Sequence, residues 1–232
     1  MTKEHAYKIF KLLEQHYPQA KMILKWSNPW ELMVAIILSA QCTDVMVNKV
    51  TAVVFPKYKK EKQELRNKYQ GYEEKIKLQK EQLIEIVNFA FVSIIELEQD
   101  VKSTGFYKNK AKNVQAAAKV VLERYNGVFP ETIAELLTIP GVGRKTANVF
   151  LGNAYHIYEG IAVDTHVIKQ AQALGLTKET KPEKIEKDLM ELYDQKDWFK
   201  LTYMLIEHGR NVRRRMSDRI VCGKKDCTLC SK

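Results

Sequence analysis

A glycine turn followed by two cations is the part of this sequence best suited to chemistry. The turn reads Pro-Gly-Val-Gly at residues 140–143, and Arg144 and Lys145 follow it directly. Gly141 and Gly143 allow left-handed backbone and leave N–H groups uncovered, so they can cradle a phosphate at the start of the next helix. A tight turn that needs glycine only for its geometry is the simpler interpretation. The adjacent cations favour phosphate binding.

A second candidate is an aspartate at the start of a helix. An apolar run at residues 161–163 leads to Asp164, and Thr165 and His166 follow. An aspartate here is a good N-cap, which is a structural role. The same position also keeps the carboxylate ionised, because backbone amides and the helix dipole favour the charged form. His166 either contacts a substrate or forms only a local hydrogen bond.

The overall charge of the chain suits a polyanionic partner. Lys and Arg number 38 against 28 Asp and Glu, which gives a formal net charge of +10. A solvated basic surface would give the same count. The longest apolar run, from Leu32 to Ala40, is shorter than the roughly 18 residues that a spanning helix needs, and the N-terminus lacks a signal-peptide core. We therefore expect a cytoplasmic monomer that binds nucleic acid and no membrane.

The elements that must position these residues are predicted to be helices. No Val/Ile/Thr alternation is long enough for a sheet, so we expect an all-α fold. Thr43 offers an N-cap for a helix that Pro56 should end. Apolar residues predict one helix from Gln82 to Val101 and a last helix over Phe199–Glu207. Residues 57–80 are dense in Lys, Glu and Gln, which predicts an exposed, charged insertion.

With these motifs the sequence resembles the endonuclease III family of helix-hairpin-helix DNA glycosylases. The resemblance covers residues 28–210, and five blocks occur in the family's order and spacing, which is far more specific than any one of them. The insertion at 57–80 looks longer than the family usually has. The blocks are IILSAQCTDVMVNK (36–49), TGFYKNKAKN (104–113), LTIPGVGRKTANV (137–149), AVDTHV (162–167) and EHGR (207–210).

The resemblance implies two helical lobes with a DNA cleft between them. One lobe would cover residues 24–156 and contain the hairpin. The other would combine residues 1–23 with residues 157–232. Lys145 would come from the first lobe and Asp164 from the second.

The resemblance also implies base-excision repair of double-stranded DNA that carries a damaged base or an abasic site. Lys145 matches the family's nucleophilic lysine and Asp164 its essential aspartate. A lysine at this position is associated with combined glycosylase and abasic-site lyase activity, here expected on oxidised pyrimidines. The lysine must be neutral to attack, and we expect partial burial, the helix N-terminus and Arg144 to favour that form.

Other residues of the matched blocks would contact DNA. Gly141 and Gly143 would hold a phosphate together with Arg144. Gln41 matches the segment that lines the lesion pocket and would fill the gap left by the extruded base, although a helix-terminal polar role is an equal alternative. His166 is the remaining candidate.

Two other functions remain open at this stage. A monofunctional mismatch or adenine glycosylase would use water activated by Asp164 and release the base without cutting the strand. A non-catalytic, structure-specific DNA-binding protein would use the hairpin and the basic tail only to hold phosphates.

The C-terminal cysteines depart from the family pattern. The family commonly ends in four cysteines that bind a [4Fe-4S] cluster, whereas here Arg213 stands where the first is expected. A cubane cluster normally takes four thiolates. Zinc held by three cysteines and His208, or no metal at all, are alternatives. The candidate ligands are Cys222, Cys227 and Cys230.

Overall fold

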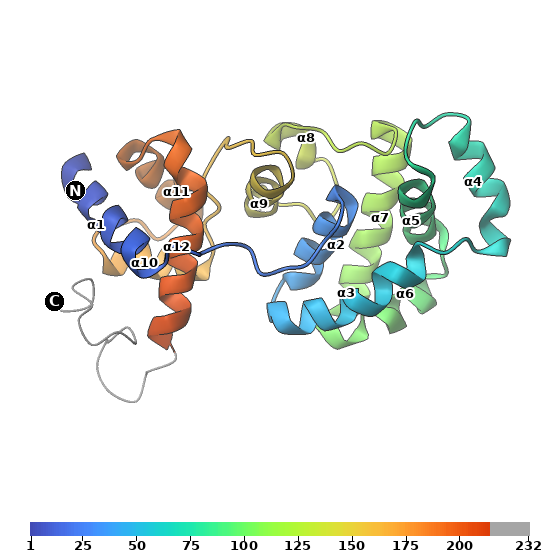
Figure 1. Ribbon diagram of the computed structural model, residues 1–232, viewed down its shortest axis with the longest axis horizontal. Helices are drawn as coiled ribbons and strands as arrows, with labels where there is room; N and C mark the ends of the chain where they lie inside the picture. The colour runs from blue at the N-terminus through green and yellow to red at the C-terminus, as the bar shows by residue number, and fades with distance from the viewer. Residues whose placement is uncertain (214–232) are drawn as a thin grey trace. The chain divides into compact units, whose positions relative to one another are not determined.

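The computed structural model describes residues 1–213, and within this range every regular element is a helix (Figure 1). The predicted all-α fold is confirmed. The chain divides into two compact units, each described here by itself: a central unit, Ile23–Ile157, and a terminal unit that combines Met1–Met22 with residues from Tyr158 onward. No helix in the described range is long and apolar enough to cross a membrane.

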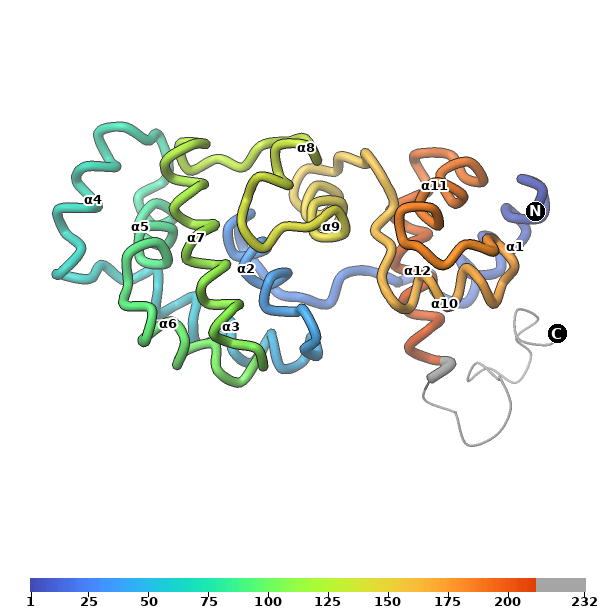
Figure 2. The backbone as a smooth tube through the Cα atoms, turned by 180° about the vertical axis from the view of Figure 1, so that it is seen from behind, coloured from blue at the N-terminus to red at the C-terminus, as the bar shows by residue number. Residues whose placement is uncertain are grey.

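Helix α2 (Pro29–Ser39) forms the core of the central unit. Asn28 caps it by accepting a hydrogen bond from the Glu31 amide at 2.9 Å, and every residue from Trp30 to Leu38 is buried. The other α-helices of the unit are α3 (Asp44–Tyr58), α4 (Arg66–Glu73), α5 (Lys80–Phe91), α6 (Ile94–Asp100), α7 (Tyr107–Tyr125), α8 (Ile133–Leu136) and α9 (Arg144–Ala154). Of these, α3, α7 and α9 pack against α2 (Figures 1 and 2).

One predicted helix end is wrong: Pro56 lies inside α3, which continues to Tyr58. Proline removes a backbone N–H and crowds the preceding turn, which normally ends a helix. Side chains hold this last turn instead. Lys57 Nζ lies 2.8 and 2.7 Å from the two carboxylate oxygens of Asp100, and the Tyr58 hydroxyl donates to Asp100 Oδ2 at 3.0 Å.

The single helix predicted from Gln82 to Val101 is in fact two helices. The chain leaves the helical path after Phe91, between α5 and α6. At the break, Gln115 Nε2 of α7 donates to the Val92 carbonyl oxygen at 2.8 Å. This bond satisfies a carbonyl at the end of α5 from a distant part of the chain, so the local apolar pattern does not reveal it.

The charged insertion is a packed part of the central unit. It contains a 3₁₀ turn, η1 (Gln63–Leu65), and α4, and it buries Leu65, Tyr69 and Ile76. Buried Asn88 of α5 holds it in place. The Tyr69 hydroxyl donates to Asn88 Oδ1 at 2.6 Å, and Asn88 Nδ2 donates to the carbonyls of Tyr58 and Lys60 at 2.6 and 2.9 Å.

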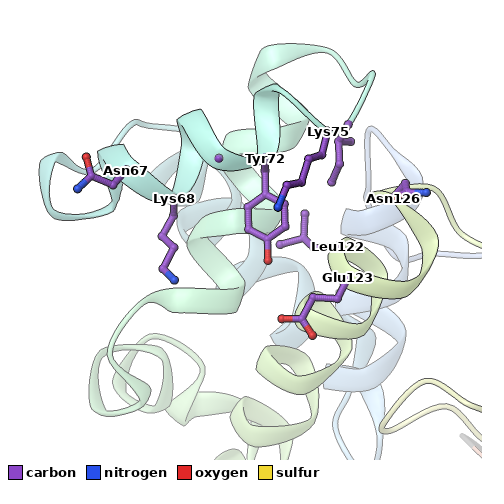
Figure 3. A pocket seen from close by; sticks show the side chains of 9 residues that line it. Asn67, Lys68, Tyr72, Lys75, Leu122, Glu123 and Asn126 are labelled. Carbon is purple, nitrogen blue, oxygen red and sulfur yellow. The ribbon is translucent and has the colours of Figure 1, made fainter.

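A cavity of about 430 Å³ opens between this insertion and the end of α7 (Figure 3). Lys68, Tyr72 and Lys75 line it from the insertion, and Glu123 and Asn126 line it from α7 and the turn that follows. Both backbone views place α4 at the opposite end of the central unit from α9 (Figures 1 and 2). The cavity is therefore separate from the glycine turn.

Within the described residues, the terminal unit packs four helices around its own apolar core. Helix α12 contacts α1 and α10, and the core includes Phe10, Val167, Leu189 and Leu205. The last helix runs well beyond the predicted Phe199–Glu207. The helices are α1 (Lys3–His16), α10 (Thr165–Ala173), α11 (Pro182–Leu192) and α12 (Gln195–Arg213).

Candidate DNA-binding and catalytic residues

The glycine turn connects α8 to α9, and its two glycines meet different constraints. Gly141 has φ +81°, and a Cβ built there would lie 2.9 Å from Asn113 Cβ of α7. Gly141 is thus needed for its backbone conformation and for close packing on α7. Gly143 has φ −99° and ψ 174°, which any residue adopts, and no described atom lies within 4 Å of a Cβ built there.

Neither the backbone conformation nor the packing at position 143 therefore requires glycine. It is the N-cap of α9, a position where Ser, Thr, Asp or Asn would satisfy exposed N–H groups. Glycine leaves those N–H groups without a capping side chain and leaves the space above them open. This arrangement suits an anion that approaches from outside the protein.

Arg144 and Lys145 occupy the first two positions of α9. The helix has no acidic residue in its first turn, so the side-chain charges add to the positive end of the helix dipole. Both side chains are exposed. The partial burial expected for Lys145 is not present in this structure.

Asp164 is the N-cap of α10 in the terminal unit. Its Oδ1 accepts hydrogen bonds from the backbone amides of His166 and Val167, both at 2.8 Å. In the described part of the chain no hydrogen bond reaches its second oxygen, Oδ2. The cap thus uses one carboxylate oxygen, and the other remains available to stabilise positive charge.

The His-Gly-Arg motif of α12 supports the start of α10. A Cβ built on Gly209 would lie 2.7 Å from His166 Nδ1, so only glycine lets the His166 ring pack at this place. His208 is buried, with its Nδ1 3.0 Å from the Tyr17 hydroxyl. It belongs to the core of the terminal unit, which makes it a poor candidate for the zinc ligand considered above.

Gln41 lies in the turn between α2 and α3 with φ +52°, a left-handed conformation that non-glycine residues rarely adopt. The turn is fixed on both sides. The Cys42 amide donates to the Ser39 carbonyl at 3.1 Å, and Thr43 Oγ1 caps α3 by accepting from the Met46 amide at 3.3 Å. The Gln41 side chain is exposed.

Phe106 is a candidate that the motifs did not single out. It stands at the N-cap of α7 with φ +47°, and it is 66% exposed. A large aromatic side chain held in solvent by strained backbone indicates function rather than packing. Apolar side chains of this kind are inserted between base steps by proteins that distort DNA. The signal in the sequence was an aromatic residue directly after Gly105.

The sites are divided between the units. The central unit holds Gln41, Phe106, the glycine turn, Arg144 and Lys145, and the terminal unit holds Asp164 and His166. Asn113, which contacts Gly141, lies two turns beyond Phe106, about 10 Å along the axis of α7.

The cysteine ligands proposed from the sequence, Cys222, Cys227 and Cys230, lie outside the described residues. Among residues 1–213, no group of three or more His, Cys, Asp or Glu side chains could hold a metal ion. The remaining cysteine, Cys42, belongs to the central unit. A cubane cluster normally takes four thiolates, and Cys42 is the one cysteine within residues 1–213.

Comparisons with known proteins identify relatives that match most of this chain. A sequence profile of the HhH-GPD superfamily of base excision DNA repair proteins matches residues 34–195. The endonuclease III of Synechocystis sp. is 42% identical over 210 residues, covering 90% of this chain and 84% of the relative.

Two solved endonuclease III structures also match. A non-covalent complex with DNA has a TM-score of 0.77 at 35% identity and covers 94% of this chain and 90% of the matched chain. A trapped covalent intermediate with DNA has a TM-score of 0.79 at 34% identity, with the same coverage.

Proposed function

We propose that this chain, which belongs to the endonuclease III family of base excision repair proteins, uses Lys145 as the nucleophile of a combined DNA glycosylase and abasic-site lyase. The substrate is double-stranded DNA that carries an oxidised pyrimidine or an abasic site. The observation that carries the proposal is the position of Lys145, exposed in the first turn of α9 beside the open space at Gly143. The covalent DNA intermediate trapped for a relative supports an attacking side chain.

In the proposed reaction, Lys145 Nζ attacks the sugar C1′ as the bond from C1′ to the base breaks. The base leaves with the bonding electrons and takes up a proton. The sugar ring opens to give an imine between Nζ and C1′. Loss of a proton from C2′ then breaks the bond between C3′ and its phosphate oxygen, and hydrolysis of the imine frees the lysine.

Asp164 is proposed to stabilise the positive charge that develops during this reaction. Positive charge builds on the sugar as the base departs, and a fixed carboxylate nearby stabilises it. The cap bonds to Oδ1 hold the group in one orientation before the reaction begins. Since Lys145 and Asp164 belong to different units, the mechanism requires both units to reach the same nucleotide.

Gln41 and Phe106 are proposed to help extrude the damaged nucleotide. The reacting C1′ is inaccessible in stacked duplex, so the nucleotide must leave the helix. Gln41 can hydrogen-bond to a base edge, and Phe106 can fill apolar space between bases. Both are exposed on left-handed backbone in the same unit as the glycine turn.

Borohydride trapping tests the nucleophile. Duplex DNA with an abasic site or thymine glycol is incubated with the enzyme, and borohydride reduces any imine to a stable adduct. We expect an adduct with the wild type and none with Lys145→Ala. Arg144→Ala is the matched control, because it removes the neighbouring cation but should leave the adduct detectable at high protein concentration. Full adduct formation by Lys145→Ala would refute the assignment.

The rival monofunctional mechanism predicts a different product. Asp164 would activate water, and the base would be released without an adduct or a nick. If the wild type excises thymine glycol but gives no adduct, that mechanism is correct and the lyase assignment is wrong.

A further inference from the structure

Lys110 is a buried lysine that the proposed chemistry does not use. It lies in the first turns of α7 and is 4% exposed. Burial lowers the pKa of its ammonium, and Cys42 partly offsets this effect. Among the described residues no carboxylate forms an ion pair with it. A buried charge without a counter-ion costs stability, so stability alone does not explain a lysine at this position.

The side-chain ammonium of Lys110 bonds to the loop that holds Phe106. Its Nζ donates to the Thr104 carbonyl oxygen at 2.7 Å. Thr104 is itself buried and ends the short helix η2 (Lys102–Thr104), just before Gly105 and Phe106. Gly105 and Phe106 both have left-handed backbone. The Lys110 side chain therefore runs back past these two residues and fixes the start of the loop from inside the protein.

The start of α7 needs such support. Phe106 at its N-cap has left-handed backbone and provides no side-chain capping bond, and the first turn has no acidic residue. Two lysines in the first four positions, Lys108 and Lys110, also oppose the helix dipole. Local forces thus do not favour this conformation, and a strained residue persists only where the surrounding structure holds it.

The turn that carries Gln41 leads into a helix that packs beside the Phe106 loop. Cys42, the next residue, contributes to the electrostatics of the Lys110 ammonium. Helix α3, which begins just after that turn, packs against η2. The helix that follows Gln41 therefore packs against the short helix that precedes Phe106.

We propose that Lys110 is a positioning residue that holds the Phe106 loop in the conformation that inserts into DNA. The proposal rests on the extrusion step of the proposed function. It assigns Lys110 no contact with the substrate. Its effect should appear in extrusion of a paired base and not in chemistry at a sugar that has already lost its base.

The test compares Lys110→Met with Lys119→Met. Methionine keeps the apolar length of the side chain but cannot donate to Thr104. Lys119 lies on the same helix, where its Nζ contacts the Phe91 ring at 5.9 Å, and the change removes the same charge. We expect Lys110→Met to lower kcat/KM for a paired oxidised pyrimidine by roughly 10- to 100-fold, as a displaced active group does. Borohydride trapping on abasic DNA should stay near the wild-type level, and Lys119→Met should match the wild type in both assays.

Two further measurements separate positioning from general damage. Hydrogen exchange of residues 102–107 should speed up in Lys110→Met while the urea midpoint stays close to that of the wild type. Lys110→Arg, which keeps a donor for Thr104, should restore part of the lost excision. Equal loss in both assays together with a lower urea midpoint would overturn the proposal, as would unchanged excision by Lys110→Met. If the wild type itself gives no adduct on abasic DNA, the proposed function fails instead.

Discussion

At the scale of single residues, Asp164 combines a structural and a chemical role that substitution can separate. Asparagine is as good an N-cap as aspartate, whereas alanine provides no acceptor. We expect Asp164→Asn to keep the stability of the terminal unit within a few tenths of a kcal/mol, and Asp164→Ala to cost about 1 kcal/mol. Both should lower excision by at least about 100-fold, because both remove the charge.

Urea denaturation and single-turnover excision measure the two effects for Asp164. Thr2→Ala, which removes the N-cap of α1 in the same unit, is the control for loss of a cap without loss of the carboxylate. Near-normal excision by Asp164→Asn would mean that the carboxylate matters only as a cap.

At Gly143, a substitution should raise the stability of the protein and weaken its binding to DNA. Aspartate at this N-cap would provide an acceptor for the first amides of α9 and oppose the charges of Arg144 and Lys145. We expect Gly143→Asp to stabilise the central unit by up to about 1 kcal/mol. It should also weaken binding to abasic duplex by tenfold or more, because a phosphate would meet a carboxylate in its place.

Thermal unfolding and fluorescence anisotropy at fixed salt test the Gly143 prediction. Gly143→Ala is the control for bulk alone, since its Cβ meets no described atom within 4 Å. If Gly143→Asp binds DNA as tightly as the wild type, the N-terminus of α9 does not hold a phosphate.

At the scale of helices, the sequence was informative where the stabilising contact is local. The Asn28–Pro29 pair starts α2, Thr43 caps α3 and Pro182 opens α11, and each start can be predicted from neighbouring residues. The errors have a different origin. The extension of α3 past Pro56 and the break at Val92 depend on partners far away in the sequence.

The same distinction applies to the candidate site. The residue types of the glycine turn and of Asp164 identify candidates because their roles follow from short patterns. Backbone strain at Phe106 and burial of Lys110 arise from three-dimensional packing, and no short pattern predicts them. The exposure of Lys145 in the DNA-free chain was also not predictable from its position in the first turn of a helix.

The attachment of the charged insertion to the rest of the central unit can be tested by substitution. Its attachment depends on Asn88, which is fully buried and links Tyr69 to the end of α3. Replacing it with alanine leaves a buried hydroxyl and two carbonyls without this partner, so we expect Asn88→Ala to cost about 2–4 kcal/mol. Residues 60–78 should then exchange amide hydrogens much faster.

Excision should change little at temperatures where Asn88→Ala remains folded, because the insertion lies at the opposite end of the central unit from α9 (Figure 1). Asn67→Ala, on the exposed side of the insertion, is the control and should leave exchange unchanged. A large loss of excision by a folded Asn88→Ala protein would show that the insertion takes part in the reaction.

At the scale of the whole molecule, each unit contains a buried ionisable group, and burial shifts the pKa values of the two groups in opposite directions. In the terminal unit, burial lowers the pKa of His208 to about 4, with a further contribution from His16. In the central unit, burial raises the pKa of Glu85 to about 8 and nearby Glu31 adds to this, although a hydrogen bond from Asn28 opposes it. His208 is therefore neutral and Glu85 protonated in the folded chain at pH 7.

The sign of each pH dependence follows from which state binds more protons. Unfolded His208 takes up a proton below its ordinary pKa of 6.5, so the terminal unit should lose stability as the pH falls from about 6.5 to about 4. Unfolded Glu85 releases its proton above 4.5, so the central unit should lose stability as the pH rises from about 4.5 through about 8. Acid should thus open the terminal unit first, and mild alkali the central unit.

Hydrogen exchange followed unit by unit between pH 5 and pH 8.5, corrected for intrinsic rates, measures this difference. Glu85→Gln should remove the alkaline loss and stabilise the central unit at pH 7 by about 2–3 kcal/mol, since the folded state no longer has to hold a proton. His208→Gln should remove the acid loss in the terminal unit and leave the central unit unchanged. The prediction fails if both units weaken in the same direction of pH, or if Glu85→Gln leaves the pH dependence of the central unit as it was.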